Sequence, residues 1–458
     1  MLNRRMLLTG TAGFAVMGLS LGKAAAASLS GIEKASMRGS INATEFGVQP
    51  GTFDDQSKAF AKLLRDAVSR DMPVFLPPGT YVVSNLSLPR RVRLSGVPGA
   101  TRIVYGGDGH LFMAEQADHV ELSGLVFDGS NRTMGDYTQG LLDLRRVAHL
   151  AIDNCQITGS GKNGVALERA TGRVERSEIS GAADAGIYSV EAGGLAISGN
   201  TVSDCTNGGI LVHRWQAAED GTMVTGNRIE RIQARGGGTG QNGNGINAFR
   251  AGNVIISGNI VSDCAFSAIR ANSASNLQIS GNTCSRSGET AVYSEFSFEG
   301  AIISNNIVDG AANGISIVNF NEGGRMGVCL GNIVRNLSTS GPYPADSPGF
   351  GVGIGVEADT TVSNNVIENA PLYGMQIGWG PYLRNVVATG NIIRKAGTGI
   401  VVSVVEGAGT AVISDNVIDG ALNGAVVGQR WAEPATGDLA SSNDTGYPHL
   451  TVERNHVS

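Results

Sequence analysis

Three glutamates at repeated positions of the chain are the first candidates for chemistry. Glu295 and Glu357 occupy the same place in two copies of a repeated segment, with one copy between them, and Glu322 lies in the intervening stretch 319–325. If the copies stack as neighbouring strands, the two backbones lie roughly 9.6 Å apart, which is two strand spacings. Carboxyl groups about 6.5 to 9.5 Å apart suit inverting hydrolysis of a glycosidic bond, in which one is the acid and the other activates water. We therefore predict all three as catalytic residues.

Basic side chains in the same region indicate a different reaction. An arginine can hold the carboxylate of a uronic acid while a base removes the adjacent proton, as in a lyase or an epimerase. His213 and Tyr293 are the predicted bases, and His213 therefore joins the predicted catalytic residues. The arginines that could hold the substrate are Arg214, Arg250, Arg270 and Arg325. Hydrolysis and proton abstraction both remain open at this point.

A stripe of outward-facing side chains accompanies these groups. Each repeat contains a strand whose first and third residues are mostly apolar, such as Ile210 and Val212, so its second and fourth residues point away from the core. Besides the arginines, the side chains predicted to bind a substrate on this stripe are Tyr188, Asn247, Phe249, Asn272, Tyr293 and Trp379. Long insertions border the stripe at residues 213–222, 233–244, 319–327, 338–351 and 428–449. Loops beside a flat strand predict a groove, and its stacked aromatic and hydrogen-bonding groups suit an extended polysaccharide.

The elements that position this stripe are copies of one short phrase. It reads Ile-Ser-Gly-Asn at residues 197–200, 256–259 and 279–282. Ten consecutive copies carry an asparagine in its last position: Asn200, Asn227, Asn259, Asn282, Asn306, Asn332, Asn365, Asn391, Asn416 and Asn455. Their spacings of 23 to 39 residues indicate a solenoid. Apolar residues three before and two after each asparagine are typical of strands. The sequence therefore predicts an all-β protein, a parallel β-helix of about 13 to 14 coils.

The repeated asparagines and the cysteines are expected to be structural. Identical amides stacked at roughly 4.8 Å can hydrogen-bond along the stack. The five cysteines fall on core positions, with Cys155 in an asparagine slot, and they are predicted to be buried thiols. No Cys-x-x-Cys or Cys/His spacing indicates a metal, and no cofactor is predicted.

The N-terminal part of the mature chain is expected to close one end of the solenoid. Residues 43–105 are predicted to form a capping segment and first coil, followed by β-helix repeats over residues 106–458. Asp54 is the predicted cap of a helix that runs to about Arg70, with Phe60, Leu63, Leu64, Ala67 and Val68 as its apolar stripe. The last coil has no obvious lid, so end-on association and closure by the segment 429–449 both remain open.

Residues 1–27 are predicted to be an export signal. Arg4 and Arg5 precede a modest apolar run, and residues 24–27 offer an A-x-A cleavage site. The paired arginines resemble a twin-arginine signal, which implies the twin-arginine translocase as a transient partner and a periplasmic or secreted protein. The run is too short and too broken by glycine and threonine for stable membrane insertion. A formal net charge of −6 argues against nucleic acid as a partner.

A family resemblance rests on three consecutive stretches, FGVQPGTFDDQSKAFAKLL, VFLPPGTYVVSNLSL and RRVRLSGV. They resemble the N-terminal entry into the right-handed β-helix of the pectate-lyase-like superfamily, which includes lyases, polygalacturonases, epimerases and phage tailspikes. With its signal and repeats, the chain also resembles a family of twin-arginine-translocated repeat proteins. The resemblance implies the handedness of the helix. It transfers no catalytic residue, because the sole Gly-His pair, Gly109-His110, lacks the aspartates that accompany it in polygalacturonases.

Two functions remain open from the sequence. In the first, an exported enzyme binds an acidic polysaccharide in the groove and cleaves or modifies it as a hydrolase, lyase or epimerase. In the second, a cell-envelope protein binds polysaccharide without catalysis or has a structural role. Loss of turnover on replacement of a glutamate would indicate the first function, whereas graded loss of binding on replacement of aromatic and arginine side chains would indicate the second.

Overall fold

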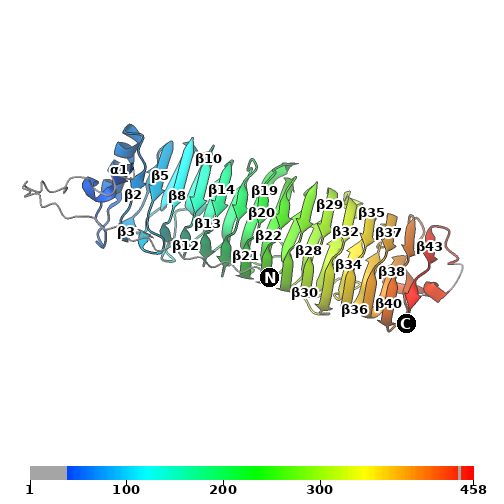
Figure 1. Ribbon diagram of the computed structural model, residues 1–458. Helices are drawn as coiled ribbons and strands as arrows, with labels where there is room; N and C mark the ends of the chain where they lie inside the picture. Colours follow the sequence, from blue (N-terminus) through cyan, green and yellow to red (C-terminus); the bar gives the residue numbers. More distant parts are fainter. Residues whose placement is uncertain (1–38, 442–444) are drawn as a thin grey trace, which may run out of the picture.

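The computed structural model describes residues 39–441 and 445–458, which form a long rod of stacked parallel strands (Figure 1). The rod is an all-β, right-handed parallel β-helix of about 14 turns, as predicted. Each coil contributes one strand to each of three faces. The predicted export signal at residues 1–27 lies outside the described residues.

The first face is a 16-stranded parallel sheet. Its strands, in spatial order, are β1 (Ile41–Asn42), β2 (Val74–Phe75), β5 (Arg91–Ser95), β8 (His119–Ser123), β11 (Leu150–Asp153), β14 (Gly172–Glu175), β17 (Ala196–Ser198), β20 (Met223–Thr225), β23 (Ile255–Ser257), β26 (Leu277–Ser280), β29 (Glu299–Ser304), β32 (Arg325–Leu330), β35 (Ala358–Ser363), β37 (Arg384–Thr389), β39 (Ala411–Ser414) and β43 (Leu450–Glu453).

The second face follows the asparagine slot of each coil. It consists of β3 (Gly79–Val83), β6 (Thr101–Tyr105), β9 (Val126–Asp128), β12 (Gln156–Thr158), β15 (Glu178–Ser180), β18 (Thr201–Ser203), β21 (Arg228–Ile232), β24 (Ile260–Cys264), β27 (Thr283–Ser287), β30 (Ile307–Ala311), β33 (Ile333–Leu337), the first parts of β36 (Val366–Ile377) and β38 (Ile392–Ser403), β40 (Val417–Ala421) and β44 (His456–Val457).

The third face carries the predicted stripe. It consists of β4 (Leu86–Leu88), β7 (Phe112–Ala117), β10 (Gly140–Val147), β13 (Asn163–Glu168), β16 (Ala185–Val190), β19 (Gly208–Glu219), β22 (Asn244–Gly252), β25 (Ile269–Asn272), β28 (Thr290–Glu295), β31 (Asn313–Ile317), β34 (Val352–Val356), the later parts of β36 and β38, and β41 (Val426–Arg430), on which β42 (Glu433–Asp438) pairs in the antiparallel sense.

The interior of the rod is filled by the alternating inward residues of all three faces. On the third face, Ile210 and Val212 are fully buried and stack on Ile246 and Ala248 of the next coil. The same alternation continues to Ile354 and Val356, which confirms the inward and outward assignment made from the sequence.

The asparagines form a continuous buried ladder at the corner between the first and second faces. The Asn259 side chain donates from Nδ2 to Oδ1 of Asn282 at 2.9 Å and to the Val224 carbonyl at 2.9 Å. The Asn259 backbone N–H donates to the same Asn282 Oδ1 at 3.0 Å. Each side-chain amide thus hydrogen-bonds to backbone groups of the neighbouring coils at a tight turn. This explains why asparagine recurs at this position. All five cysteines are free and buried, as predicted.

The first coils are covered by α1 (Ser57–Ser69), whose buried residues are Phe60, Leu63, Leu64 and Ala67. Two details of the predicted cap are wrong. Val68 is 41% exposed and does not belong to the buried stripe. The side chain that accepts the Ser57 N–H, at 2.9 Å, belongs to Asp55 and not to Asp54.

The remaining short elements close the two ends or lie in loops. η2 (Ala43–Phe46) precedes α1, η3 (Phe320–Glu322) lies in a loop beside the third face, and η4 (Leu439–Ser441) follows β42. Leu439 of η4 packs into the end of the core with Leu450. Of the two alternatives for the C-terminal end, the structure therefore favours closure by the segment that follows β41. In the described part of the chain, no helix has the length and apolarity needed to span a membrane.

Candidate functional site

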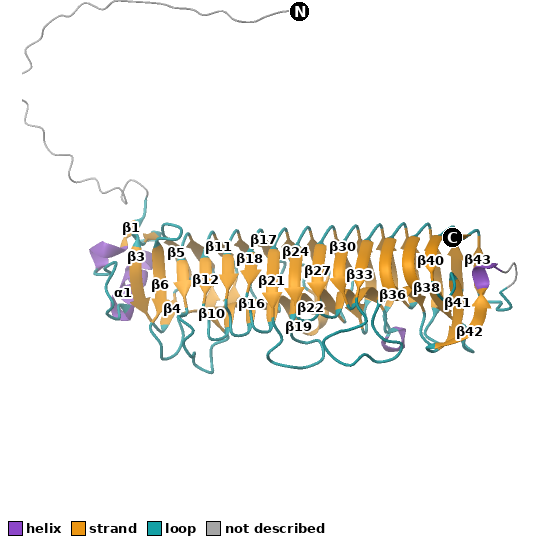
Figure 2. Ribbon diagram, turned by 90° about the horizontal axis from the view of Figure 1, so that it is seen from below, coloured by secondary structure: helices purple, strands orange, loops and turns teal. Residues whose placement is uncertain are grey.

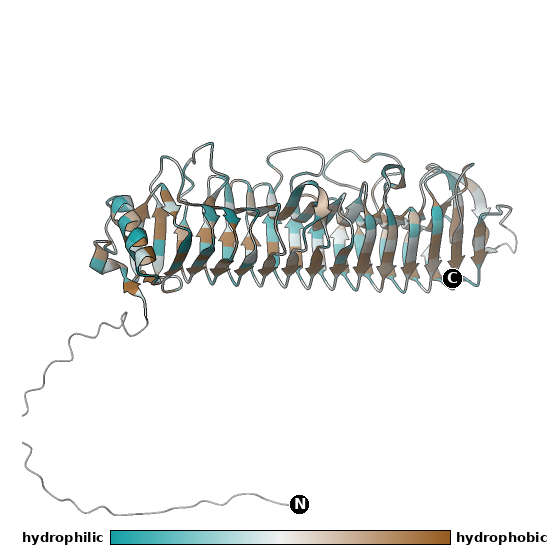
Figure 3. Ribbon diagram, turned by 90° about the horizontal axis from the view of Figure 1, so that it is seen from above, coloured by the Kyte–Doolittle hydropathy of each residue, from teal (hydrophilic) through white to brown (hydrophobic). Residues whose placement is uncertain are grey.

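The long loops gather along one side of the rod, whereas the opposite corner is made of short, regular turns (Figures 2 and 3). Two cavities lie under these loops on the third face. The downstream cavity, of about 230 Å³, is lined from the loop 338–351 and the strands β28, β31 and β34. The upstream cavity, of about 360 Å³, is lined from the loop 233–243 and the strands β19, β22 and β25.

One row of outward side chains forms the floor of both cavities. Asn247, Arg270, Tyr293, Ser316 and Gly355 are register partners on successive strands from β22 to β34. The small residues Ser316 and Gly355 create the downstream hollow. A Cβ added at Gly355 would have Ser316 Oγ as its nearest neighbour, at 3.7 Å, so the space above the strand is open.

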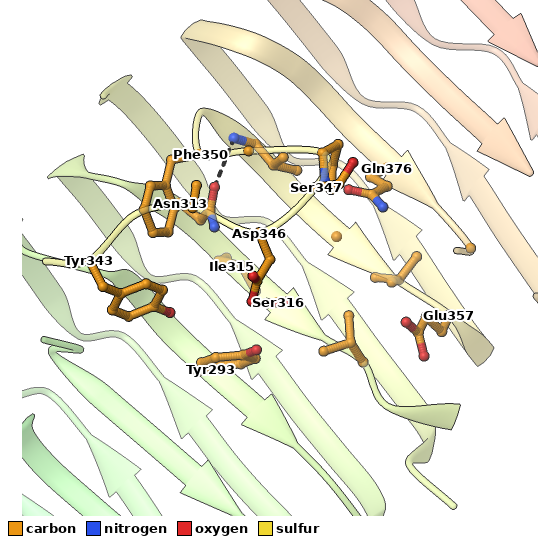
Figure 4. A pocket seen from close by; sticks show the side chains of 18 residues that line it. Tyr293, Asn313, Ile315, Ser316, Tyr343, Asp346, Ser347, Phe350, Glu357 and Gln376 are labelled. Atoms are coloured by element: carbon orange, nitrogen blue, oxygen red, sulfur yellow. Dashed lines mark hydrogen bonds between the residues drawn. The ribbon is translucent and has the colours of Figure 1, made fainter. Parts of the chain in front are cut away.

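Glu357 is the carboxyl group that lines the downstream cavity from the end of β34 (Figure 4). It is 8% exposed, and its Oε2 accepts the Phe320 N–H at 2.6 Å. Burial raises its pKa to about 7, although the Phe320 and Asn319 N–H groups act in the opposite direction. No arginine, lysine or histidine is among the described residues that line this cavity. The carboxyl group is therefore close to half-protonated at neutral pH and able to donate a proton.

A second carboxyl group enters the same cavity from the loop above it. Figure 4 shows Asp346 extending down towards Ser316, between Tyr343 on one side and Glu357 on the other. The loop is attached to the third face by the Tyr343 hydroxyl, which donates to Glu289 Oε1 at 2.6 Å. Glu289 is buried at the start of β28, and this burial raises its pKa.

The structure separates the three predicted glutamates. Glu357 alone of the three lines the downstream cavity. Glu295 is buried in an ion pair, with its Oε1 accepting from Arg270 Nε at 2.6 Å and from Asn272 Nδ2 at 2.9 Å. Glu322 is exposed on η3 and accepts a hydrogen bond from Asn321. The carboxyl partner that the cavity offers to Glu357 is Asp346.

The predicted base His213 is among the residues that line the upstream cavity. Its ring is packed edge-on between Tyr188 and Phe249, with both centroid distances 5.5 Å. Burial lowers its pKa to about 4, so the imidazole is neutral at pH 7. The upstream cavity also brings together Asn247, Phe249, Arg270 and Asn272, as the stripe predicted. Tyr293 lies in the downstream cavity instead.

The predicted arginines are largely occupied by partners within the protein. Arg270 binds Glu289 at 3.0 Å as well as Glu295, and its guanidinium lies 5.1 Å from the Tyr293 ring centroid. The other pairings are Arg214 with Glu191 at 3.0 Å, Arg325 with Glu299 at 2.6 Å, and Arg250 with the Phe249 ring at 4.7 Å and the Trp215 carbonyl at 2.6 Å. Trp379 packs on Trp431, 5.5 Å between centroids, and lines neither cavity.

Sequence reasoning missed Tyr343, Asp346 and Gln376, which line the downstream cavity, and Glu289, which accepts the hydrogen bond of the Tyr343 hydroxyl. The insertion 338–351 was predicted to border the groove, but nothing in its sequence shows which of its side chains turn inward. Gln376 follows Gly355 in the same register row, so an extension of the predicted stripe by one coil would have found it.

The sequence of residues 104–240 and 220–324 matches the family model described as "Right handed beta helix region". Among solved structures, the pre-mature gene product 12 of bacteriophage phi29 superposes with a TM-score of 0.61 at 16% identity, over 87% of this chain and 58% of that one. The Dettilon tailspike protein gp208 gives a TM-score of 0.51 at 15% identity, over 84% and 69% of the two chains.

The chain has a right-handed β-helix fold. A weaker likeness is to the A-module of the Azotobacter vinelandii mannuronan C-5 epimerase AlgE4, with a TM-score of 0.47 and 15% identity over 90% of this chain and all of that one. This β-helix spans little more than half of the phi29 protein. No curated protein sequence matches the sequence of this chain significantly. Within the described ranges, no group of three or more His, Cys, Asp and Glu side chains is placed to hold a metal ion.

Proposed function

We propose that this β-helix binds a carbohydrate chain along its third face and cleaves a glycosidic bond in the downstream cavity, with Glu357 as the general acid. The observation that carries the proposal is that two carboxyl groups, Glu357 and Asp346, line one cavity, with no cationic side chain among the described residues around it. A buried carboxyl group with a pKa of about 7 is protonated often enough at neutral pH to serve as an acid.

The roles of the two groups follow from their surroundings. The Glu357 proton is transferred to the oxygen of the leaving sugar, and the Glu357 carboxylate that forms is stabilised by the Phe320 N–H. Asp346, on the loop above the floor, either accepts a proton from the water that attacks the sugar carbon, or bonds to that carbon itself, and water then hydrolyses this bond. Tyr293, Asn313 and Gln376 offer hydrogen bonds to the sugar hydroxyls.

The charges support an uncharged sugar better than the acidic one expected from the sequence. The predicted binding of a uronate carboxylate required an available arginine, but Arg270 forms ion pairs with Glu289 and Glu295. An anionic substrate would instead lie against Asp346 and Glu357, and this repulsion would cost binding energy in a partly desolvated site. We therefore propose a neutral glycan as the substrate and keep the sequence-based expectation that the protein is exported.

The test is a screen of the purified protein against neutral and acidic polysaccharides, with reducing ends, unsaturated products and binding measured together. We expect new reducing ends from a neutral polymer, and a cleavage rate that falls as the pH rises through about 7, because only protonated Glu357 is active. Glu357→Gln should abolish cleavage while binding is kept. Glu322→Gln, an exposed glutamate in the neighbouring loop, is the matched control and should cleave like the wild type.

A second candidate function is binding without catalysis. It is favoured by the pairing of Glu295 with Arg270, which takes one of the predicted carboxyl groups out of any reaction. Under this alternative the wild type binds a polysaccharide and releases no product, and Glu357→Gln leaves the affinity unchanged. Absence of both binding and cleavage would refute both functions.

A further inference from the structure

The upstream cavity contains two polar atoms without a hydrogen-bond partner. Asn247 Oδ1 and His213 Nε2 are both buried and unpartnered, and both residues line this cavity. Asn247 is 5% exposed and stands at an outward position of β22. More than nine in ten buried polar groups in native proteins are hydrogen-bonded, and an orphaned one costs stability. Two such atoms, on residues that line one cavity, indicate that a ligand completes their bonding.

The charge of the cavity limits what this ligand can be. His213 is neutral at pH 7, and Arg270 is already bound by two carboxylates. No aspartate or glutamate is among the described residues that line the cavity, so it has no free charge of either sign. An anion or a cation would therefore lose its hydration without gaining an ion pair, which excludes a charged ligand group here.

The shape and the lining point to a hydroxylated ring. Phe249 and Phe296 offer aromatic surface on the wall of the cavity, and the loop residues Thr239 and Gln241 close it from the other side. A sugar ring has an apolar C–H face that packs on aromatic rings, and its hydroxyl groups both donate and accept hydrogen bonds. A hydroxyl can thus donate to Asn247 Oδ1, and another can pair with His213 Nε2 in either tautomer.

We propose that the upstream cavity is a subsite for an uncharged sugar ring of the same glycan that enters the downstream cavity. The floor row runs without interruption from Asn247 to Gly355, four strand spacings or roughly 19 Å. A glycan must therefore be several units long to fill both cavities. This inference rests on the proposed carbohydrate binding but not on the proposed cleavage by Glu357.

The test measures affinity against chain length. The purified protein is titrated with cello-, malto- and chito-oligosaccharides from dimer to octamer, and with oligogalacturonates as the charged comparison. We expect one neutral series to bind at least about tenfold more tightly once the chain is long enough for both cavities. Asn247→Ala and Phe249→Ala should remove that gain and leave the affinity for short oligomers unchanged. Met223→Ala, exposed on the first face of a neighbouring coil, is the control.

A second readout separates a ligand site from a structural one. Asn247→Leu removes the unpartnered oxygen and keeps the branched shape of the side chain, so it should raise the melting temperature while it abolishes the chain-length gain. A lower melting temperature with unchanged binding would mean that Asn247 has a structural or water-bonded role, and would overturn the subsite. Binding without any chain-length gain would also overturn the subsite, and Glu357→Gln would still test the cleavage separately. Absence of binding in every series would overturn both.

Discussion

Glu357→Gln is expected to change the pH dependence of stability as well as activity. The wild-type carboxyl group is buried at the end of β34 and must lose a proton there above its pKa of about 7, whereas in the unfolded chain it does so near 4.5. Glutamine has almost the same shape, can accept the Phe320 N–H through its amide oxygen, and never ionises. The variant therefore isolates the cost of the buried charge.

The magnitude follows from the raised pKa. A rise from 4.5 to about 7 corresponds to roughly 3 kcal/mol, at about 1.4 kcal/mol per pKa unit. The folded state keeps the Glu357 proton to a higher pH than the unfolded chain does. The wild type therefore loses this stability as the pH rises from about 4.5 to about 7, and the loss is complete above that window. Glu357→Gln should match the wild type near pH 4 and exceed it by up to roughly 3 kcal/mol near pH 8.

The assay compares melting temperatures and urea midpoints of the two proteins across this pH range. A long repeat protein need not unfold in one step, so the difference between variants is more informative than either absolute value. Glu322→Gln serves again as the control, because its side chain is exposed and should give no pH-dependent difference. Carbon-13 NMR of labelled glutamate carboxyl groups gives the Glu357 pKa directly, with the signal assigned by its loss in the variant.

A constant difference between Glu357→Gln and the wild type from about pH 4 to about pH 8 would refute this reasoning. It would mean that Glu357 ionises at its ordinary pKa, and hence that water or a cation reaches the carboxyl group in the folded protein. The role of general acid at neutral pH would then be refuted as well, because the carboxyl group would be almost wholly deprotonated.

Two further predictions concern the floor of the cavity and the ladder. Gly355→Ala should behave like the wild type, because its Cβ meets nothing closer than Ser316 Oγ at 3.7 Å, whereas Gly355→Leu should fill the hollow and reduce cleavage at least about tenfold. Equal activity of the two variants would place the substrate elsewhere. Asn306→Ala should lower the free energy of unfolding of its part of the rod by roughly 3 kcal/mol or more, since it breaks two bonds donated by Nδ2 and two accepted by Oδ1. The measurement is amide hydrogen exchange in the coils next to Asn306, and Asn321→Ala, at an exposed position, is the control. Equal protection in the two variants would show that the ladder contributes little to stability.

The fold could be predicted because its determinants are local and repeated. The alternation that buries Ile210 and Val212 is visible within four residues, and ten stacked asparagines make the coil spacing unmistakable. The arrangement of the outward stripe followed from the same alternation. Asn247 and Phe249, which the alternation placed on this stripe, both line the upstream cavity.

The downstream site could not be predicted to the same depth, because its loop has no repeat. The Tyr343 hydroxyl donates a hydrogen bond to Glu289, which lies 54 residues earlier in the sequence. This contact helps to place Asp346 in the cavity. The sequence predicted Glu295 as a catalytic residue and Arg270 as a substrate contact, because it shows that both point outward but does not show that they bind each other.

The sequence by itself thus determined the β-helix, its ladder and the face on which polar and aromatic side chains gather, because short-range periodicity sets strand direction and coil spacing. Tertiary structure alone decided which of those side chains remain available to a ligand. Burial and ion pairing depend on contacts between coils. Arg270 and Glu295 neutralise each other across the adjacent strands β25 and β28, and Asn247 Oδ1 is left without a partner. Glu357 is buried beside the loop that contains Phe320, and no cation is among the described residues that line its cavity.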